Sequence, residues 1–417
     1  MILNSMAYYD YLKQQPDNKN RASEKYKNKR ILCIASMASN LDNFNRNNVD
    51  IFLNLGCEVT LAANFNTKED TNSREKVDIF VKEMKKKSVN IVSVDFSRKI
   101  GNVYLQLKSI MQVRRLLQQD FALIHCHSPI CAAIVRLLSR KNKKKQRTMI
   151  LYTAHGFHFF KGAPLKNWII FYPMEKYLSR YTDVLITINT EDFNLAKKKF
   201  HAKKTIYIPG VGIDLERFAI YLTKEKRNLI CNKLNIPDDA FIILSVGELN
   251  HNKNHEVIIK AIKKVNNVKV HYIIIGMGKC EKYLKHLSDS LNIKRQVHFL
   301  GYRSDVALFY HMADVFAFPS HREGLGLAAI EAMTAGLPII TSNIHGINDY
   351  SIDGVTGFKT SPNNIYGFSQ MINILLDNPD MRKEMGMYNH SYSKKFGEEH
   401  VNSIMNKLYY GVLNSLE

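Results

Sequence analysis

Two glutamates, Glu323 and Glu331, stand at a spacing that suits the binding of a polar ligand. The first precedes a turn that contains Gly324 and Gly326, and the second is expected about two turns inside the helix that follows. The free N–H groups at the start of a helix attract an anion such as phosphate, and glycines let that anion come close to the backbone. We therefore expect both carboxylates to bind the hydroxyl groups of one ligand, with its phosphate held between them by backbone amides.

A simpler interpretation treats the two glutamates as ordinary helix residues. A carboxylate before a helix is favoured by the helix dipole, and carboxylates are common on exposed helix faces. Small residues, however, let this helix pack closely, so a glutamate among them is costly unless hydroxyl groups bind it. This consideration favours a binding site. The small residues are Ala328, Ala329, Ala332 and Ala335.

The site requires a strand, a turn, a helix and a second strand in that order. Asp314–Pro319 is a short apolar run with two aromatic residues that ends at a proline, which is typical of a short buried strand. Leu325–Ala335 has only two β-branched residues, so it favours a helix. Gly336 ends that helix, and Pro338–Thr341 begins the next strand. The sequence therefore predicts that backbone amides and strand ends meet at this turn.

Apolar strand-like runs alternate with helical segments along most of the chain. Such repeated βα units predict an α/β protein with doubly wound parallel sheets. The length of 417 residues exceeds what one hydrophobic core usually holds, so two or three domains are expected. The remaining expected strands are Ile31–Ala35, Cys57–Ala63, Val89–Val94, Leu123–His127, Thr148–Tyr152, Val184–Ile188, Phe241–Val246, Val270–Ile275 and Val297–Tyr302.

Polar and glycine residues follow several of these strands. Ligands of open α/β sheets collect at the carboxyl ends of the strands. His155 lies at such a position, either as a catalytic group or as a structural hydrogen-bonding residue. Gly247 and Gly276 end two strands of the second half, and Lys253 follows the first of them. These residues are the further candidates for ligand contacts.

The E-x7-E arrangement of Glu323 and Glu331 resembles the signature of retaining, family 4 type glycosyltransferases with the GT-B fold. Four further blocks agree with this family in order and content. The first two are most similar to the subgroup that builds bacterial exopolysaccharide, capsule or other lipid-linked glycans. The four blocks are Tyr152–Pro164, Ile208–Asp214, Ser245–Asn254 and Ile273–Gly278.

The resemblance implies the GT-B fold, in which two Rossmann-like, doubly wound parallel-sheet domains face a cleft. It divides the chain into a polar N-terminal extension (1–28), an acceptor domain (29–209) and a nucleotide-sugar donor domain (210–395). The last segment (396–417) is expected to form a helix that packs back on the first domain. The two glycines of Ile208–Asp214 make a hinge plausible at the crossover, and Asp214 is expected to cap the following turn.

The resemblance further implies a hexosyltransferase that takes a sugar from a nucleoside diphosphate sugar, with uridine diphosphate as the expected nucleotide. The acceptor would be a glycan or a lipid-pyrophosphate-linked glycan, and the anomeric configuration would be retained. No metal ion and no cofactor are expected, because the nucleotide-sugar is itself the substrate. The departing phosphate would help to deprotonate the acceptor hydroxyl.

Residue roles carry over by motif position. Glu323 and His155 are the expected catalytic-site residues that hold and contact the transferred sugar, while Glu331 accepts ribose hydroxyls. Lys253 and the helix amides at Gly326 and Leu327 would stabilise the diphosphate. The expected donor-binding set is Gly247, Lys253, Gly276, Arg303, Glu323, Gly324, Leu325, Gly326, Leu327 and Glu331. The expected acceptor-side set is Ser36, Ser39 and Asn40.

The chain departs from the family pattern at two places. Glu248 occupies a position where relatives often carry arginine, so Arg303, Arg322 or backbone amides would have to supply the missing positive charge. The turn after the first strand lacks the glycine-rich loop of many relatives, and the small polar residues there are the alternative contacts.

The formal net charge of +21 indicates anionic partners. The basic stretches 82–87 and 136–147 are either solvated loop charge or a docking surface for anionic lipid headgroups. The apolar run Trp168–Tyr172 either packs in the core or anchors at the membrane interface. No run approaches 18 apolar residues and the first ten residues have no sustained apolar core, so we expect a cytoplasmic protein. Because the resemblance implies a lipid-linked acceptor, we expect this protein to be peripheral on the inner face of the plasma membrane.

Three alternative interpretations compete with parts of this one. A nucleotide-sugar epimerase shares the fold, but the E-x7-E arrangement argues against it. A basic nucleic-acid-binding or scaffold protein fits the charge, yet no recognition motif is present, so no nucleic-acid partner is expected. His125, His127 and Cys131 are compatible with a metal site, although a strand end explains them better. The six cysteines are scattered and are expected to be reduced thiols.

Overall fold

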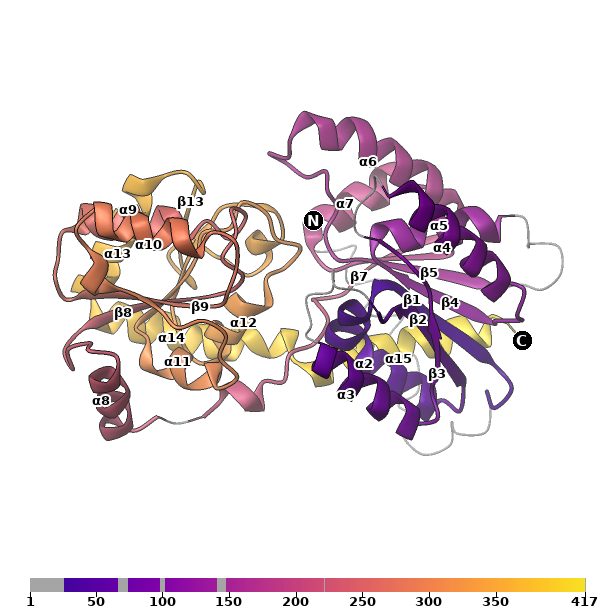
Figure 1. Ribbon diagram of the computed structural model, residues 1–417, viewed down its shortest axis with the longest axis horizontal. Helices are drawn as coiled ribbons and strands as arrows, with labels where there is room; N and C mark the ends of the chain where they lie inside the picture. The colour runs from indigo at the N-terminus through magenta and orange to yellow at the C-terminus, as the bar shows by residue number, and fades with distance from the viewer. Residues whose placement is uncertain (1–25, 67–73, 98–101, 141–147, 221, 417) are drawn as a thin grey trace. The chain divides into compact units, whose positions relative to one another are not determined.

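The computed structural model describes residues 26–66, 74–97, 102–140, 148–220 and 222–416 (Figure 1). The chain divides into two compact units. The first comprises Met1–Val211 together with Glu399–Glu417, and the second comprises Gly212–Glu398. Of the expected N-terminal extension, residues 1–25 lie outside the described part of the chain. The C-terminal segment belongs to the first unit.

The first unit contains a seven-stranded sheet in the order β3-β2-β1-β4-β5-β6-β7, and all neighbouring strands are parallel. The order reverses between β1 and β4, which makes the carboxyl ends of these strands the switch point where ligands bind in open α/β sheets. The strands are β1 Arg30–Met37, β2 Glu58–Asn64, β3 Asn90–Ser93, β4 Leu123–His127, β5 Met149–Ala154, β6 Val184–Thr187 and β7 Lys204–Tyr207. The helices are α2 Ala38–Asn54, α3 Arg74–Lys86, α4 Val103–Leu116, α5 Pro129–Ser139, α6 Leu165–Leu178, α7 Thr190–Lys199 and α15 Glu398–Asn414.

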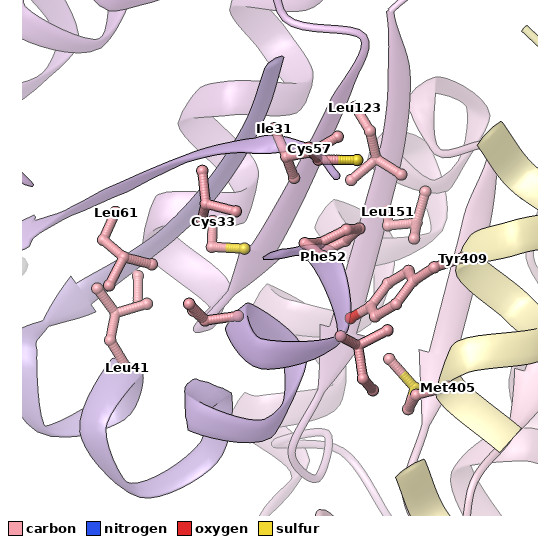
Figure 2. Close-up of a cluster of buried hydrophobic side chains, with 14 of the residues drawn as sticks. Ile31, Cys33, Leu41, Phe52, Cys57, Leu61, Leu123, Leu151, Met405 and Tyr409 are labelled. Atoms are coloured by element: carbon pink, nitrogen blue, oxygen red, sulfur yellow. The ribbon is translucent and has the colours of Figure 1, made fainter. Parts of the chain in front are cut away.

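Alternate residues of β1 point to opposite faces of this sheet and enter two separate cores. Ile31 and Cys33 pack with residues of α2, α3 and α15, as Figure 2 shows for part of this cluster. Leu32 and Ile34 pack on the other face with residues of α4 and α5. On the α15 side, Tyr409 lies 4.0 Å from the ring of Phe52, measured between centroids. The C-terminal helix therefore completes the core of the first unit.

The second unit contains a six-stranded sheet in the order β10-β9-β8-β11-β12-β13, again with every neighbouring pair parallel. Its switch point lies between β8 and β11. The strands are β8 Phe241–Val246, β9 Val270–Ile275, β10 Val297–Phe299, β11 Val315–Phe318, β12 Ile339–Ser342 and β13 Gly357–Thr360. The α-helices are α8 Lys224–Lys233, α9 His255–Val265, α10 Glu281–Ser290, α11 Val306–Met312, α12 Leu327–Thr334, α13 Ile365–Asp377 and α14 Pro379–Ser393. A short 3-10 helix, η4, spans His345–Asp349.

These sheets confirm the predicted α/β architecture of two doubly wound parallel domains. Two edge strands were not predicted: β7 fell in the stretch interpreted partly as the crossover, and β13 was not recognised. Only one residue in each of these strands is fully buried, so neither shows the continuous apolar run of a central strand. The predicted start of the helix after Glu323 was wrong by two residues, because α12 begins at Leu327 rather than Leu325. Asp214 accepts a hydrogen bond from the Arg217 N–H at 3.2 Å and so caps its turn as expected.

None of the helices in the described residues is long and apolar enough to cross a bilayer.

Candidate functional site

The turn before α12 is held in one path by two close backbone approaches. Gly326 caps the helix with φ 95°, and a Cβ atom there would lie 2.4 Å from the ring of Phe318. A Cβ atom on Gly346 would lie 1.9 Å from the carbonyl oxygen of Gly324, and the Gly346 N–H donates to the Glu323 carbonyl at 3.3 Å. Side chains at these positions would displace the turn. The N–H groups at the start of α12 therefore have a defined direction.

A charged pair lies beside this turn. The Nζ atom of Lys253 is 2.7 Å from Oε1 of Glu323, and the two side chains are only 21% and 13% exposed. The same Nζ atom lies 4.9 Å from the ring centre of Phe318. The structure therefore brings together two of the predicted donor-binding residues. An ammonium, a carboxylate and a helix start in one place can bind an anionic ligand that also carries hydroxyl groups.

Two asparagines that were not selected from the sequence connect the loop around Lys253 to the turn before α12. Asn252 donates from Nδ2 to the Arg322 carbonyl at 2.9 Å and accepts from the His321 N–H at 2.8 Å. Asn254 donates from Nδ2 to the carbonyl oxygens of Pro319 (3.1 Å) and Pro362 (2.8 Å). Asn254 adopts φ 55°, a conformation that asparagine tolerates better than most residues. The asparagine-rich sequence before α9 was the available signal for this role.

Glu331 has a different partner. The hydroxyl of Tyr310, which is fully buried, donates to Oε2 of Glu331 at 2.8 Å and also lies 3.1 Å from the carbonyl oxygen of Ala328. Burial raises the pKa of Glu331, while Tyr310 and the charge of Arg217 act to lower it. Because α12 begins at Leu327, Glu331 is the fifth residue of the helix and lies in its second turn, closer to the start than predicted.

The glycines after β8 and β9 pack backbone against backbone. A Cβ atom on Gly276 would lie 1.9 Å from the Gly247 carbonyl oxygen, and one on Gly278 would lie 2.4 Å from the Leu249 carbonyl oxygen. The Gly276 N–H donates to the Gly301 carbonyl at 2.8 Å. These glycines thus permit the close approach of the loops that follow the two strands.

Arg303 was expected to supply positive charge in place of Glu248. Its guanidinium instead forms two hydrogen bonds to the carboxylate of Asp305, at 2.8 and 2.5 Å. The described hydrogen bonds of this side chain therefore go to a neighbour in its own loop and not to the Lys253–Glu323 pair. Its contact with a donor stays a prediction.

Three histidines gather at the carboxyl ends of β4 and β5 in the first unit. Nδ1 of His127 lies 3.2 Å from Nε2 of His155. His125 contacts Thr153 through Nε2 (2.8 Å) and Tyr409 through Nδ1 (2.9 Å). Burial lowers the pKa of His125 to about 3 and that of His155 to about 4, and it also lowers the pKa of His127. All three imidazoles are therefore neutral near pH 7.

Next to these histidines lies a cavity of about 20 Å³, which is room for roughly one water molecule. His127, Thr153 and His155 line it together with residues of α2 and α15. The ring of Phe44 on α2 stacks on His155 with 4.7 Å between centroids. Sequence reasoning had not selected Phe44 or His127 for this place.

The predicted acceptor-side residues lie at the switch point of the first sheet. Ser36 is near the end of β1, and its N–H donates to Oγ of Ser128, the residue after β4, at 2.9 Å. Ser39 is buried in the first turn of α2, and Asn40 accepts from Nδ2 of Asn45 at 3.3 Å through its carbonyl oxygen. Both serines are almost fully buried, at 7% and 1% exposure. Whether these residues bind an acceptor stays a prediction.

The alternative metal site at His125, His127 and Cys131 has poor ligands. Both ring nitrogens of His125 are engaged by Thr153 and Tyr409. Burial raises the pKa of the Cys131 thiol well above its usual value, whereas a metal ligand must be a thiolate. In the ranges that the structure describes, no three His, Cys, Asp or Glu side chains form a group that could hold a metal ion. All six cysteines are buried free thiols, as predicted.

Comparisons with known proteins place these two units in one family. Residues 226–391 match the family model of glycosyl transferases group 1, and residues 51–217 match that of Glycosyltransferase Family 4. The putative glycosyltransferase EpsD of Bacillus subtilis is 33% identical over 384 residues, which cover 91% of this chain and 96% of that protein. The UDP-Gal:alpha-D-GlcNAc-diphosphoundecaprenol alpha-1,3-galactosyltransferase of Escherichia coli is 29% identical over 270 residues, or 63% of this chain and 68% of that protein.

Among solved structures, HepE of Anabaena in complex with UDP superposes with a TM-score of 0.70 at 15% identity, covering 92% of this chain and 100% of that one. At this identity the likeness concerns the fold. Together with the family matches and the near full-length relative, the two doubly wound sheets lead to one conclusion: the chain belongs to the family 4 glycosyltransferases and has their GT-B fold.

Proposed function

We propose that this protein is a retaining glycosyltransferase that transfers a sugar from a UDP-sugar to a lipid-pyrophosphate-linked glycan during synthesis of a bacterial surface polysaccharide. The observation that carries the proposal is the Lys253–Glu323 pair beside the start of α12. The donor named for the Escherichia coli relative is UDP-galactose, and its acceptor is a sugar on diphosphoundecaprenol. These names support the substrate class for this chain.

The charges of the pair explain how a donor would bind. In the absence of a ligand, the Lys253 ammonium is matched by the Glu323 carboxylate. The diphosphate of a donor replaces that carboxylate as the partner of the lysine, and the sugar hydroxyls become the partners of Glu323. Each charged group thus keeps a partner when the donor enters, which avoids leaving a buried charge uncompensated.

The same groups act on the transition state. As the bond to the sugar breaks, negative charge accumulates on the departing diphosphate and positive charge on the sugar ring. Lys253 and the N–H groups that begin α12 stabilise the diphosphate in place, without a reorganisation of water. Tyr310 holds one oxygen of Glu331, so this carboxylate is oriented to accept the ribose hydroxyls. In the first unit, His155 serves the transferred sugar as a neutral hydrogen-bonding group. Metal independence is part of this proposal.

Nucleotide binding and turnover test the proposal together. UDP-sugars at about 100 times their dissociation constant should stabilise the folded protein by about 2.7 kcal/mol, whereas GDP- and ADP-sugars should give smaller shifts.

Glu331→Gln should weaken UDP-sugar binding and turnover while leaving the circular dichroism spectrum unchanged. Transfer should require an added lipid-diphosphate acceptor and proceed in EDTA. Interconversion of UDP-sugars without an acceptor would instead indicate an epimerase, and the proposal would then be wrong.

A membrane-facing surface on the first unit fits a lipid-linked acceptor. Six apolar side chains on α4 and α6 are between 57% and 74% exposed: Tyr104, Leu107, Met111, Leu165, Ile169 and Ile170. Glu175 is the sole acidic residue of these two helices, and it is buried in an ion pair with Arg136 at 2.9 Å. The charged side chains that face outward on the helices are therefore lysines and arginines. A helix face of apolar and basic residues is typical of docking onto an anionic lipid surface.

The apolar run Trp168–Tyr172 is divided between side chains that pack in the core and side chains that are exposed. Trp168, Phe171 and Tyr172 pack against the core on the α4 and α5 side of the sheet, whereas Ile169 and Ile170 are exposed. In the basic stretch 136–147, residues 141–147 lie outside the described residues. In the basic stretch 82–87, Lys87 forms an ion pair with Asp50 at 2.7 Å. The exposed face of α6 is consequently the better defined part of the proposed membrane surface.

Vesicle co-sedimentation tests this surface. We expect binding to vesicles rich in phosphatidylglycerol and weak binding to pure phosphatidylcholine. The double substitution Ile169→Asp and Ile170→Asp should reduce binding by more than about tenfold, since burying each side chain contributes more than about 1 kcal/mol. Ile79→Asp on α3 is a matched control, because Ile79 is also an exposed apolar helix residue. An equal loss in the control, or no vesicle binding by the native protein, would contradict the assignment.

A further inference from the structure

The contact between His127 and His155 indicates a role for His127 in orienting the His155 ring, which the family matches do not assign. We propose that His127 is a positioning residue: its Nδ1 atom shares a hydrogen bond with Nε2 of His155. The other ring nitrogen of His155, Nδ1, is then the one that contacts the substrate. The inference rests on the proposed function in one respect: His155 must contact the transferred sugar. The hydrogen bond itself is a feature of the first unit alone.

The register of the sheet creates the contact. His127 is the last residue of β4 and pairs with Thr153 of β5, so His155 follows just beyond the same sheet edge. The 3.2 Å separation between His127 Nδ1 and His155 Nε2 is within hydrogen-bond distance. Phe44 stacks on the His155 ring with an interplanar angle of 29°. The stacked ring and the hydrogen bond together restrict both the plane and the rotation of the His155 imidazole.

Two neutral imidazoles in this contact share one proton between the facing nitrogens. If His127 donates from Nδ1, then His155 carries its own proton on Nδ1 and presents a donor. If His155 donates from Nε2, then its Nδ1 is a bare acceptor and His127 carries a proton on Nε2. In both states Nε2 of His155 is engaged. The hydrogen-bonding character of the free edge of His155 is thus coupled to the protonation of His127.

The second ring nitrogen of His127, Nε2, is placed to contact a water molecule. Nε2 of His127 is buried and has no hydrogen-bond partner among the described residues, and His127 lines the 20 Å³ cavity. A buried imidazole nitrogen without a partner is costly, so this atom is the natural contact for a single water in that cavity. His125 does not compete for the role, because its ring nitrogens are bound by Thr153 and Tyr409.

Substitutions at residue 127 separate positioning from packing. Asparagine places an amide near the position of the imidazole Nδ1, whereas leucine fills similar space without a hydrogen bond. His127→Leu should lower kcat by about 10- to 100-fold, because a small displacement of a reacting group has an effect of this size. The KM for the donor should change by less than about twofold, because most donor contacts belong to the second unit. His127→Asn should recover most of the lost rate.

A double-mutant cycle decides whether His127 acts through His155. In a His155→Ala background, His127→Leu should have little further effect on kcat. If the two losses multiply, or if His127→Asn is as impaired as His127→Leu, the positioning role is wrong. Melting temperatures of all variants control for loss of folding.

Nitrogen-15 NMR of the native protein provides a test that is independent of turnover and of variant stability. The ring nitrogens of His155 should show a neutral imidazole with Nε2 hydrogen-bonded to His127, and the signal of Nδ1 should respond to ligand. This measurement also distinguishes the two proposals, since the hydrogen bond can be present in a protein that transfers no sugar. A His155 Nε2 signal without a hydrogen bond to His127 would overturn the inference even if the protein proves to be an active glycosyltransferase.

Discussion

The two sheets share the same construction at one edge and differ at the other. In both, an aspartate just before a strand accepts a hydrogen bond from a neighbouring strand: Asp183 from the Ile150 N–H and Asp314 from the Ile242 N–H, each at 2.8 Å. At the carboxyl edge, the first unit carries a contact between the buried His127 and the partly buried His155, and the second carries an ion pair beside a glycine turn. The amino ends of the two sheets thus share an aspartate hydrogen bond between neighbouring strands, whereas the side chains at the carboxyl ends differ.

The difference follows from the ligand that each edge is proposed to serve. A diphosphate carries charge, so its site needs an ammonium, oriented amides and room for close approach. Sugar hydroxyls are neutral, and neutral imidazoles can donate to or accept from them without the desolvation of a charge. Burial accordingly lowers the pKa of His155 to about 4, so this ring stays neutral in the range where the reaction is expected to run. Substitutions at the two edges should therefore fail in different ways.

The largest effect is expected at Lys253. Lys253→Ala removes the ammonium that we assign to the diphosphate, and kcat/KM should fall by about 10²- to 10³-fold, as for the loss of one strong transition-state contact. UDP binding, measured by calorimetry, should weaken as well. Lys260→Ala is the control, because Lys260 forms its ion pair with Glu256 within α9. Near-native turnover of Lys253→Ala would contradict the proposal that the carboxyl end of the second sheet binds the diphosphate.

A second test concerns the shape of the glycine turn. Gly346→Ala places a methyl group 1.9 Å from the Gly324 carbonyl oxygen, so the turn before α12 must move. We expect about a 10- to 100-fold loss of UDP affinity, because the helix amides lose their direction. Gly354→Ala introduces strain at φ 73° but meets no atom within 4 Å, and it should retain UDP affinity. If both variants bind UDP normally, the path of the turn is not what orients the ligand.

Local pattern was sufficient to predict the framework and to select the candidate residues around the turn before α12. Mainly apolar runs identified Leu123–His127, Phe241–Val246 and Val270–Ile275 with the bounds that the structure shows, because central strands are buried on both faces and carry few polar side chains. The glycines and Glu323 before α12 and Glu331 within it were likewise recognisable as one pattern, since they are close in sequence. Two of the four edge strands, β7 and β13, were missed because their sequences carry little apolar signal, whereas the edge strands β3 and β10 were predicted.

Contacts between distant residues were beyond reach from one sequence. Tyr310 is 21 residues from Glu331, and His127 is 28 residues from His155. Which polar side chains meet depends on strand register and helix rotation, and a shift of one residue would change every pair. Arg303 illustrates the limit: its charge suggested a donor contact, yet its hydrogen bonds go to Asp305. Residue type therefore indicates the chemistry, and packing determines the partner.

The smallest effect is a pH dependence of the first unit that arises from its buried imidazoles. Burial lowers the pKa of His125 from 6.5 to about 3. Below pH 6.5 the unfolded chain binds a proton at this residue and the folded unit does not, so the free energy of unfolding must decrease as the pH falls from about 6.5 towards 3, and it is unaffected at higher pH. One such histidine contributes a slope of about 1.4 kcal/mol per pH unit.

Hydrogen exchange of the β4 and β5 amides between pH 7 and 5 measures this slope in the first unit alone. His125→Gln should reduce the slope by about one proton. The comparison rests on slopes, because the substitution at residue 125 also alters the hydrogen bonds to Thr153 and Tyr409 and so changes the absolute stability. An unchanged slope in His125→Gln would mean that this imidazole is protonated in the folded state as readily as in water. The histidines at the carboxyl ends of the first sheet would then include a charged imidazole. The proposed difference between a neutral site in the first unit and a charged site in the second would be wrong.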